Sequence, residues 1–246
     1  MRLTEPAARD PIAGGGLLLS GPGASRVPLP LAMIIAIDGP AAAGKSTIAR
    51  RLAQELNLAF LDTGAMYRAV TRVALDRDVA PGDAAACARL AREIDLDFDA
   101  EGRLSIDGRS AEPGIRAAEV DACVSAVSAH PEVRRAIVPK QRVIASRRGV
   151  VAEGRDIGTV VFPRADHKFF LIASATERAR RRAEQIGKPD EQAAIETALR
   201  RRDELDSTRA DSPLVRAQDA ELIDTDELSI EGVVAHILDR VRGAVS

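Results

Sequence analysis

Short apolar runs alternate with amphipathic stretches along most of the chain. The apolar runs predict β-strands, and they occupy residues 33–37, 58–61, 149–152, 168–173 and 221–223. The amphipathic stretches predict helices over residues 47–56, 63–75, 132–147, 191–205 and 229–241. A further helix follows the run at 168–173, and we expect Thr176 to cap it.

This alternation indicates the fold class. Strands that are apolar on both sides and separated by helices are typical of a doubly wound α/β protein, with a parallel sheet covered by helices on both faces. The sequence therefore predicts a five-stranded parallel core. Ligands of such sheets bind at the carboxyl ends of the strands. Asp38, Asp62, the segment 153–156 and Ser174 fall at those ends.

Two segments depart from the alternation. Residues 77–129 contain a Pro-Gly turn, an Ala-rich helix and two short strands at 96–99 and 104–106, which indicates a small inserted subdomain. Residues 178–205 form two arginine-rich helical arms around a break at Gly187, which predicts a mobile lid. The remaining core then comprises residues 33–76, 130–177 and 206–246.

The first 32 residues have a different composition, with a glycine run and several prolines. Their leucine run is too short for a membrane span or a secretory signal, so we expect a disordered extension and no membrane association. Met33 is the first residue of the first predicted strand. We therefore expect the natural chain to begin there, which mass spectrometry of the natural N-terminus would test.

Charge and composition exclude several classes of function. The chain of 246 residues has 35 basic and 37 acidic residues, 2% aromatic residues and no Trp, which argues against an extended nucleic acid as partner. The two cysteines, Cys87 and Cys123, are far apart and fit reduced thiols in the cytoplasm. The three histidines are isolated from one another, so we expect no zinc site.

The strongest chemical signal lies between the first predicted strand and the first helix. Residues 39–46 read GPAAAGKS, a glycine-rich loop that ends in Lys45 and Ser46. Such a loop directs backbone N–H groups and a helix N-terminus at one point, which favours a polyphosphate. We expect Lys45 to reach the β and γ phosphates of a nucleoside triphosphate and Ser46 to ligate Mg²⁺. The residues expected to bind this nucleotide, which is ATP in the reaction given below, are Gly39, Pro40, Ala41, Ala42, Ala43, Gly44, Lys45, Ser46 and Thr47.

A phosphate-binding loop alone does not separate a kinase from a nucleotide switch or a motor. Arginines supply the second signal, because the guanidinium group is a planar fork that matches phosphate and stays charged. Arg155 is the most informative, since it directly follows a predicted buried strand. A lid arginine that closes on the transferred group is worth on the order of 10³ to 10⁵ in rate, so we expect at least one to be catalytic.

Several segments together resemble one family. The motifs are residues 35–47, 61–68, 153–163, 202–209, 212–214, 219–220 and 224–225. In this order they resemble the bacterial cytidylate kinases, in the nucleoside monophosphate kinase group of P-loop kinases. The segment 77–129 is similar to the monophosphate-binding insert of that family.

The resemblance implies a role for each matching residue. It places CMP or dCMP as acceptor near Thr63 and Tyr67, with Arg68, Arg155 and Arg202 on its phosphate. It implies that Asp156, Arg134 and Ser125 read the cytosine, that Asp206 accepts from the sugar hydroxyls, and that Arg209 lies near the acceptor phosphate. It further implies Lys45, Arg155, Arg178 and Arg182 as catalytic residues, and Glu153 as a ligand of Mg²⁺ through water.

The expected reaction transfers the γ-phosphoryl group of ATP to CMP or dCMP in a cytoplasmic monomer. An acceptor phosphate is already an anion, so no general base is required. One alternative changes the acceptor to UMP, AMP or a small metabolite such as shikimate. Others are a nucleotide switch or ATPase component, and a binding protein with a relict loop, although the intact Lys45 and Ser46 disfavour the last.

Overall fold

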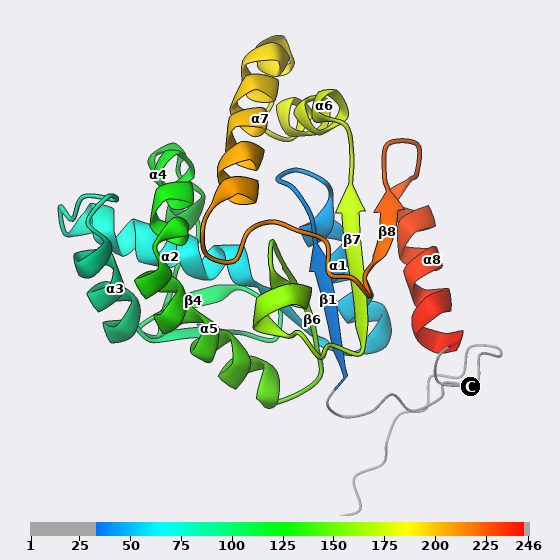
Figure 1. Cartoon of the computed structure of the whole chain (residues 1–246), viewed down its shortest axis with the longest axis horizontal. Coiled ribbons are helices and arrows are strands. Elements are labelled where there is room, and N and C mark those ends of the chain that lie inside the picture. The colour runs from blue at the N-terminus through cyan, green and yellow to red at the C-terminus, as the bar shows by residue number, and fades with distance from the viewer. Residues whose placement is uncertain (1–32, 244–246) are drawn as a thin grey trace, which may run out of the picture.

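The computed structural model describes residues 33–243, so the N-terminal extension expected at 1–32 lies outside the described part. A five-stranded sheet forms the centre (Figure 1). All its pairings are parallel, and the strand order is β2-β6-β1-β7-β8. The strands are β1 (Ile34–Asp38), β2 (Ala59–Asp62), β6 (Val150–Gly154), β7 (His167–Ile172) and β8 (Glu221–Asp224). The predicted parallel five-stranded α/β fold is confirmed.

Helices cover both faces of this sheet, and the sheet's pleat explains why. Ile35 and Ile37 point to one face, where they pack with α1 (Lys45–Leu56) and α8 (Ile230–Gly243). Ala36 points to the other face and packs with α2 (Thr63–Asp76) and α5 (Pro131–Ser146). Alternate residues of one strand thus enter two separate apolar layers, as expected for a period of two.

The segment 77–129 packs directly on the second of these layers. Its hydrophobic side chains share one buried cluster with α2 and α5 rather than forming a core of their own. Its division from the rest of the chain as a subdomain therefore stays a prediction. Its elements are α3 (Ala84–Glu93), the antiparallel strands β3 (Leu96–Phe98), β4 (Leu104–Ile106) and β5 (Arg109–Ser110), the short helix η1 (Gly114–Arg116), and α4 (Ala118–Ala129).

Two helical arms rise above the carboxyl edge of the sheet (Figure 1). They are α6 (Ala175–Gln185) and α7 (Gln192–Thr208), joined through the short helix η3 (Pro189–Glu191). The expectation that Thr176 caps the first arm is wrong. Strand β7 ends at Ile172, so the helix begins earlier, and Ser174 Oγ accepts the capping hydrogen bond from Glu177 N at 3.2 Å.

Parallel pairing brings the ends of three strands together. Asp38 lies opposite Gly154, and Asp62 lies opposite Glu153. A short helical turn, η2 (Ile157–Val161), follows β6 at the same edge. Within residues 33–243 no helix has the length and apolar character needed to cross a membrane.

Candidate active site

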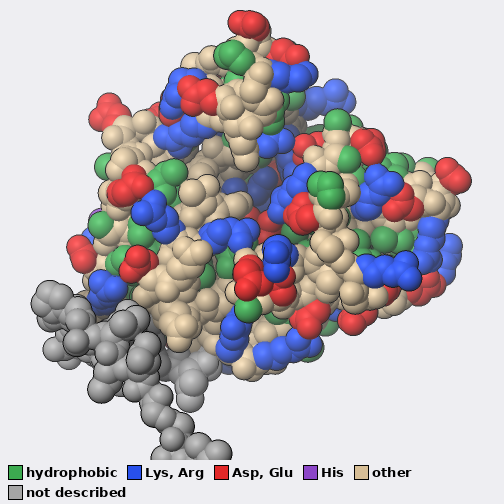
Figure 2. Space-filling view, turned by 180° about the vertical axis from the view of Figure 1, so that it is seen from behind, with side chains coloured by type: hydrophobic (Ala, Val, Ile, Leu, Met, Phe, Trp, Pro, Cys, Tyr) green, Lys and Arg blue, Asp and Glu red, His purple; other side chains and the backbone are tan. Residues whose placement is uncertain are grey.

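A cleft of about 1790 Å³ opens at the carboxyl edge of the sheet. The loop after β1 lines its floor, α2 and α4 line one wall, and the arms α6 and α7 cover it. Figure 2 shows Lys and Arg side chains inside the hollow beneath the arms. The sequence-predicted residues from Ala41 to Thr47 line this cleft, whereas Gly39 and Pro40, at the start of the same loop, do not.

The glycine-rich loop has the backbone geometry that phosphate binding requires. Gly39 and Gly44 have φ angles of 147° and 85°, which L-residues with a side chain rarely adopt. A Cβ atom on Gly39 would lie 2.1 Å from the carbonyl oxygen of Leu171, so no side chain fits there. Helix α1 begins at Lys45, and its free N–H groups therefore face the cleft.

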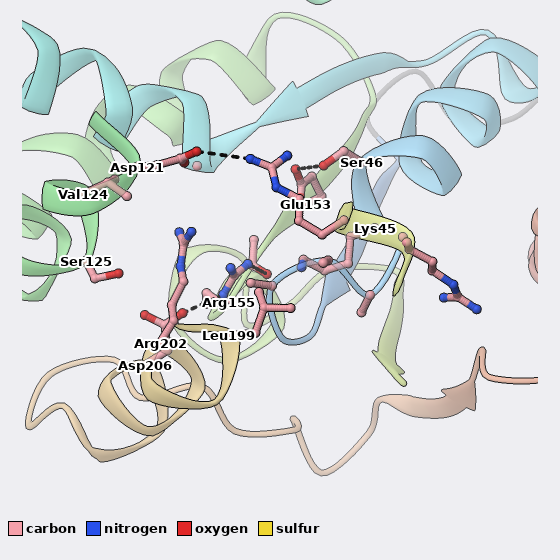
Figure 3. A pocket seen from close by; sticks show the side chains of 18 of the residues that line it. Lys45, Ser46, Asp121, Val124, Ser125, Glu153, Arg155, Leu199, Arg202 and Asp206 are labelled. Carbon is pink, nitrogen blue, oxygen red and sulfur yellow. Dashed lines mark hydrogen bonds and ion pairs between the residues drawn. The ribbon is translucent and has the colours of Figure 1, made fainter. Parts of the chain in front are cut away.

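Lys45, Ser46 and Glu153 form one polar group at the end of this loop (Figure 3). Lys45 Nζ donates to the carbonyl oxygen of Pro40 at 2.6 Å, and Ser46 Oγ donates to Glu153 Oε1 at 2.6 Å. Burial raises the pKa of Glu153, and burial together with Arg155 lowers the pKa of Lys45. A bound polyphosphate would raise the pKa of the lysine again, because an adjacent anion favours the ammonium form.

This donor set fits Mg²⁺. The ion prefers oxygen ligands, and in nucleotide sites it is held by one or two protein groups together with phosphate oxygens. A hydroxyl and a carboxylate 2.6 Å apart supply those protein groups. Among residues 33–243 there is no group of three or more His, Cys, Asp or Glu side chains that would hold a metal ion without such phosphates.

Three predicted arginines converge on the centre of the cleft, with Arg68 on α2, Arg155 after β6 and Arg202 on α7. Arg155 Nε donates to Asp206 Oδ2 at 2.8 Å, which ties the strand end to α7 (Figure 3). Burial, then Arg155 and Arg68, lowers the pKa of Arg202 to about 10. Guanidinium groups that are buried and close to one another favour the binding of an anion.

A second polar group lies deeper, behind the arginines. The buried side chains of Arg134 and Asp156 form an ion pair, and Arg209 lies 3.6 Å from the same carboxylate. The guanidinium of Arg134 also lies 5.2 Å above the ring of Tyr67, and burial raises the pKa of that tyrosine to about 12. Ser125 lines the cleft from α4. Of the three residues that the resemblance implied for base recognition, Arg134 and Asp156 are in contact, and Ser125 lines the same cleft.

Other predicted residues have their polar groups engaged by the protein. Thr63 Oγ1 donates to the carbonyl oxygen of Glu153 at 2.7 Å. The buried guanidinium of Arg178 donates to the carbonyl oxygens of Ala41 and Ala173, both at 3.0 Å, and lies 2.7 Å from Asp203. Arg178 therefore joins the root of the lid to the phosphate-binding loop. It has the geometry of a positioning residue, because its guanidinium is engaged by the protein and does not line the cleft.

Sequence reasoning missed three charged residues that act at this site. Asp121 on α4 contacts Arg68 and Arg182, and Arg116 lies 2.8 Å from Asp62. Asp203 pairs with Arg178. A single charged residue within the insert or the lid has no distinguishing sequence pattern, so only the tertiary structure reveals these contacts.

The fold and the cleft together define a class. A parallel sheet whose first strand leads into a phosphate-binding loop, opposed by a cluster of arginines beneath helical arms, is the architecture of a P-loop kinase. The model of the cytidylate kinase family matches residues 35–243, and the chain belongs to this family.

Individual relatives agree with this assignment. The chain is 46% identical to the cytidylate kinase of Solibacter usitatus (strain Ellin6076), over 87% of this chain and 94% of that protein. It is 48% identical to the cytidylate kinase of Geobacillus sp. (strain WCH70), over 84% of this chain and 95% of the relative. It is also 46% identical to a bifunctional pantoate ligase/cytidylate kinase of Synechococcus sp. (strain CC9605), over 86% of this chain but only 46% of that relative.

Proposed function

We propose that the protein transfers the γ-phosphoryl group of ATP to CMP or dCMP, giving ADP and CDP or dCDP. One observation carries the proposal: a single cleft contains the glycine-rich loop, a cluster of arginines and the buried ion pair of Arg134 and Asp156. A donor and an acceptor on opposite sides of Arg155 would meet with their phosphates aligned. Alignment of the reacting groups supplies a large part of the catalysis in phosphoryl transfer.

The donor side consists of the loop and its two end residues. Backbone N–H groups of residues 41–47 would hold the β and γ phosphates, and Lys45 would move from Pro40 to those phosphates. Ser46 and Glu153 would hold Mg²⁺, the serine directly and the glutamate through water. When bound, the ion would neutralise charge on the phosphate oxygens of ATP.

The acceptor side would bind the monophosphate through Arg68, Arg155 and Arg202, because three cations offset a dianion. The ring of cytosine presents an amino donor beside acceptor atoms. Asp156 would accept from the amino group, while Arg134 and Ser125 would donate to the acceptors. Asp206 would accept from the sugar hydroxyls. Arg209, which lies 3.6 Å from Asp156, would add positive charge near the acceptor phosphate.

The lid would complete the site during turnover. Closing of α6 and α7 over bound nucleotides would exclude water and bring Arg182 to the transferred group. No proton transfer to a protein base is needed, since the attacking oxygen belongs to an ionised phosphate. We further propose that the protein works as a monomer in the cytoplasm, where ATP and free nucleotides are available.

A screen of acceptors tests this function. ADP release would be measured with ATP and Mg²⁺ against CMP, dCMP, UMP, AMP and shikimate. We expect CMP and dCMP to give the highest kcat/KM, and EDTA to abolish turnover until Mg²⁺ is restored. Equal or faster turnover with UMP, AMP or shikimate would replace the cytidylate acceptor. ADP release that needs no acceptor would instead indicate an ATPase.

A further inference from the structure

Asp121 occupies an unusual place for an acidic residue, inside the arginine cluster. Its Oδ1 lies 2.6 Å from a guanidinium nitrogen of Arg68 on α2, and its Oδ2 accepts a hydrogen bond of 3.1 Å from Arg182 on α6. Figure 3 shows Asp121 directed into the cleft from α4. One carboxylate therefore bridges the insert, the core helix and the lid.

The electrostatics of the cluster explain what this carboxylate does. Burial is the main cause that lowers the pKa of Arg202; Arg155 and Arg68 add to this effect, and Asp206 and Asp121 oppose it. Asp121 thus offsets part of the positive charge that makes the cleft attractive to phosphate. Its side chain is 30% exposed, so it can leave the two arginines without a large change in packing.

The negative charge of Asp121 is not needed to hold α4 against α2. Helix α4 already packs on α2 through the buried Val124 and Val127, which join the same cluster as Met66 and Val70. An ion pair outside the cleft also bridges the two helices, because Glu119 lies 3.0 Å from Arg72. A purely structural role for Asp121 would duplicate contacts that exist without it.

We propose that Asp121 is an internal competitor for the acceptor phosphate. Its carboxylate and a phosphate group require the same guanidinium donors of Arg68 and Arg182, so an incoming phosphate must displace it. The residue would thereby lower the affinity of the acceptor and speed the release of the phosphorylated product. This inference rests on the proposed function in one respect only, namely that Arg68 and Arg182 bind phosphate.

Equilibrium binding of three ligands to the full chain tests the proposal. Asp121→Asn keeps the size of the side chain and removes its charge. We expect it to tighten the binding of CMP and of inorganic phosphate by about 3- to 30-fold, the range between an exposed and a partly buried charge interaction. Binding of cytidine, which has no phosphate, should stay unchanged. Isothermal titration calorimetry measures all three dissociation constants.

Glu119→Gln is the matched control. It removes the same charge from the same helix, and it also breaks an ion pair to α2, but its partner Arg72 lies outside the cleft. We expect wild-type affinities for all three ligands. If Asp121→Asn fails to fold by circular dichroism, Asp121→Ser carries the same prediction, and Asp121→Glu should retain the weaker binding of the wild type.

Weaker binding of phosphate by Asp121→Asn would overturn the proposal, because it would show that Asp121 holds Arg68 in position. An affinity change no larger than that of Glu119→Gln would also overturn it. Failure of the proposed function gives a different result. If the wild type does not phosphorylate CMP but Asp121→Asn still binds inorganic phosphate more tightly, the competitor role stands and the acceptor is another phosphate.

Discussion

The buried carboxylate of Asp38 offers a quantitative test of the site's construction. Asp38 ends β1, immediately before the phosphate-binding loop, and is 4% exposed. Its two oxygens accept hydrogen bonds from the backbone N–H groups of Ile157 and Gly158, both at 2.7 Å. These contacts attach the turn that follows Arg155 and Asp156 to the strand that carries the donor loop.

Burial is the main reason that the pKa of Asp38 rises from 3.8 to about 6, against the opposing effect of the two backbone hydrogen bonds. The folded state therefore retains a proton that the unfolded state has already lost. A difference of about 2.2 in pKa, at 1.36 kcal/mol per unit, corresponds to about 3 kcal/mol. This stability is fully present below pH 3.8 and is lost as the pH rises to about 6.

Asp38→Asn isolates this contribution, because the amide has no charge and does not titrate. The variant also loses one acceptor for the two N–H groups, which costs about 1–3 kcal/mol at every pH. We expect the unfolding free energy of the wild type, minus that of the variant, to fall by about 2.4 kcal/mol between pH 4 and pH 7, because at pH 4 the unfolded carboxyl is already partly ionised. Urea denaturation at intervals of half a pH unit, followed by circular dichroism, measures this difference.

Asp166→Asn provides a matched control. Asp166 also accepts a backbone hydrogen bond of β1, from Ile34 N at 2.7 Å, but at the opposite end of the strand and in an exposed position. The comparison separates the general cost of losing such a bond from the effect of burying a charge. A wild-type minus Asp38→Asn difference that stays constant from pH 4 to pH 7, or that grows, would refute the reasoning.

Three further substitutions test the roles of individual residues. Lys45→Ala should lower kcat for CMP by about 10³-fold with little change in the affinity for CMP, because the lost charge faces the transferred group; a kcat within tenfold of the wild type would exclude that role. Asp156→Ala should reduce the kcat/KM for CMP relative to the kcat/KM for UMP by at least about tenfold, since it removes the acceptor for the cytosine amino group. An unchanged ratio of the two values would show that another residue reads the base. Arg178→Ala should destabilise the protein by about 3 kcal/mol, because Asp203 loses its buried partner, and it should raise the KM for ATP more than the KM for CMP. Urea denaturation measures the first effect and steady-state kinetics the second. A selective loss of kcat without destabilisation would instead favour direct contact of Arg178 with phosphate.

The sequence by itself determined the parallel sheet, its helices and the donor loop. These features depend on local patterns: apolar runs bounded by turns, helical periodicity, and glycines where the backbone must adopt positive φ angles, as at Gly39 and Gly44. The cap of α6 was misplaced, at Thr176 instead of Ser174, because helix boundaries depend on where the preceding strand ends.

The candidate site was only partly accessible from the sequence. Arg155 and Asp156 were evident because they follow a buried strand, at the edge where every parallel α/β sheet binds its ligands. The resemblance supplied Arg134 and Arg209, and the structure brings both to the carboxylate of Asp156.

Only the tertiary structure decided which arginines form hydrogen bonds with distant parts of the chain. Arg178 and Arg182 lie one helical turn apart in the same arginine-rich stretch, yet the first is buried against the donor loop and the second reaches Asp121. Asp121 is 61 residues from Arg182 in sequence. Contacts of this kind depend on how the insert and the lid pack against the core, and periodicity within one helix contains no information about that packing.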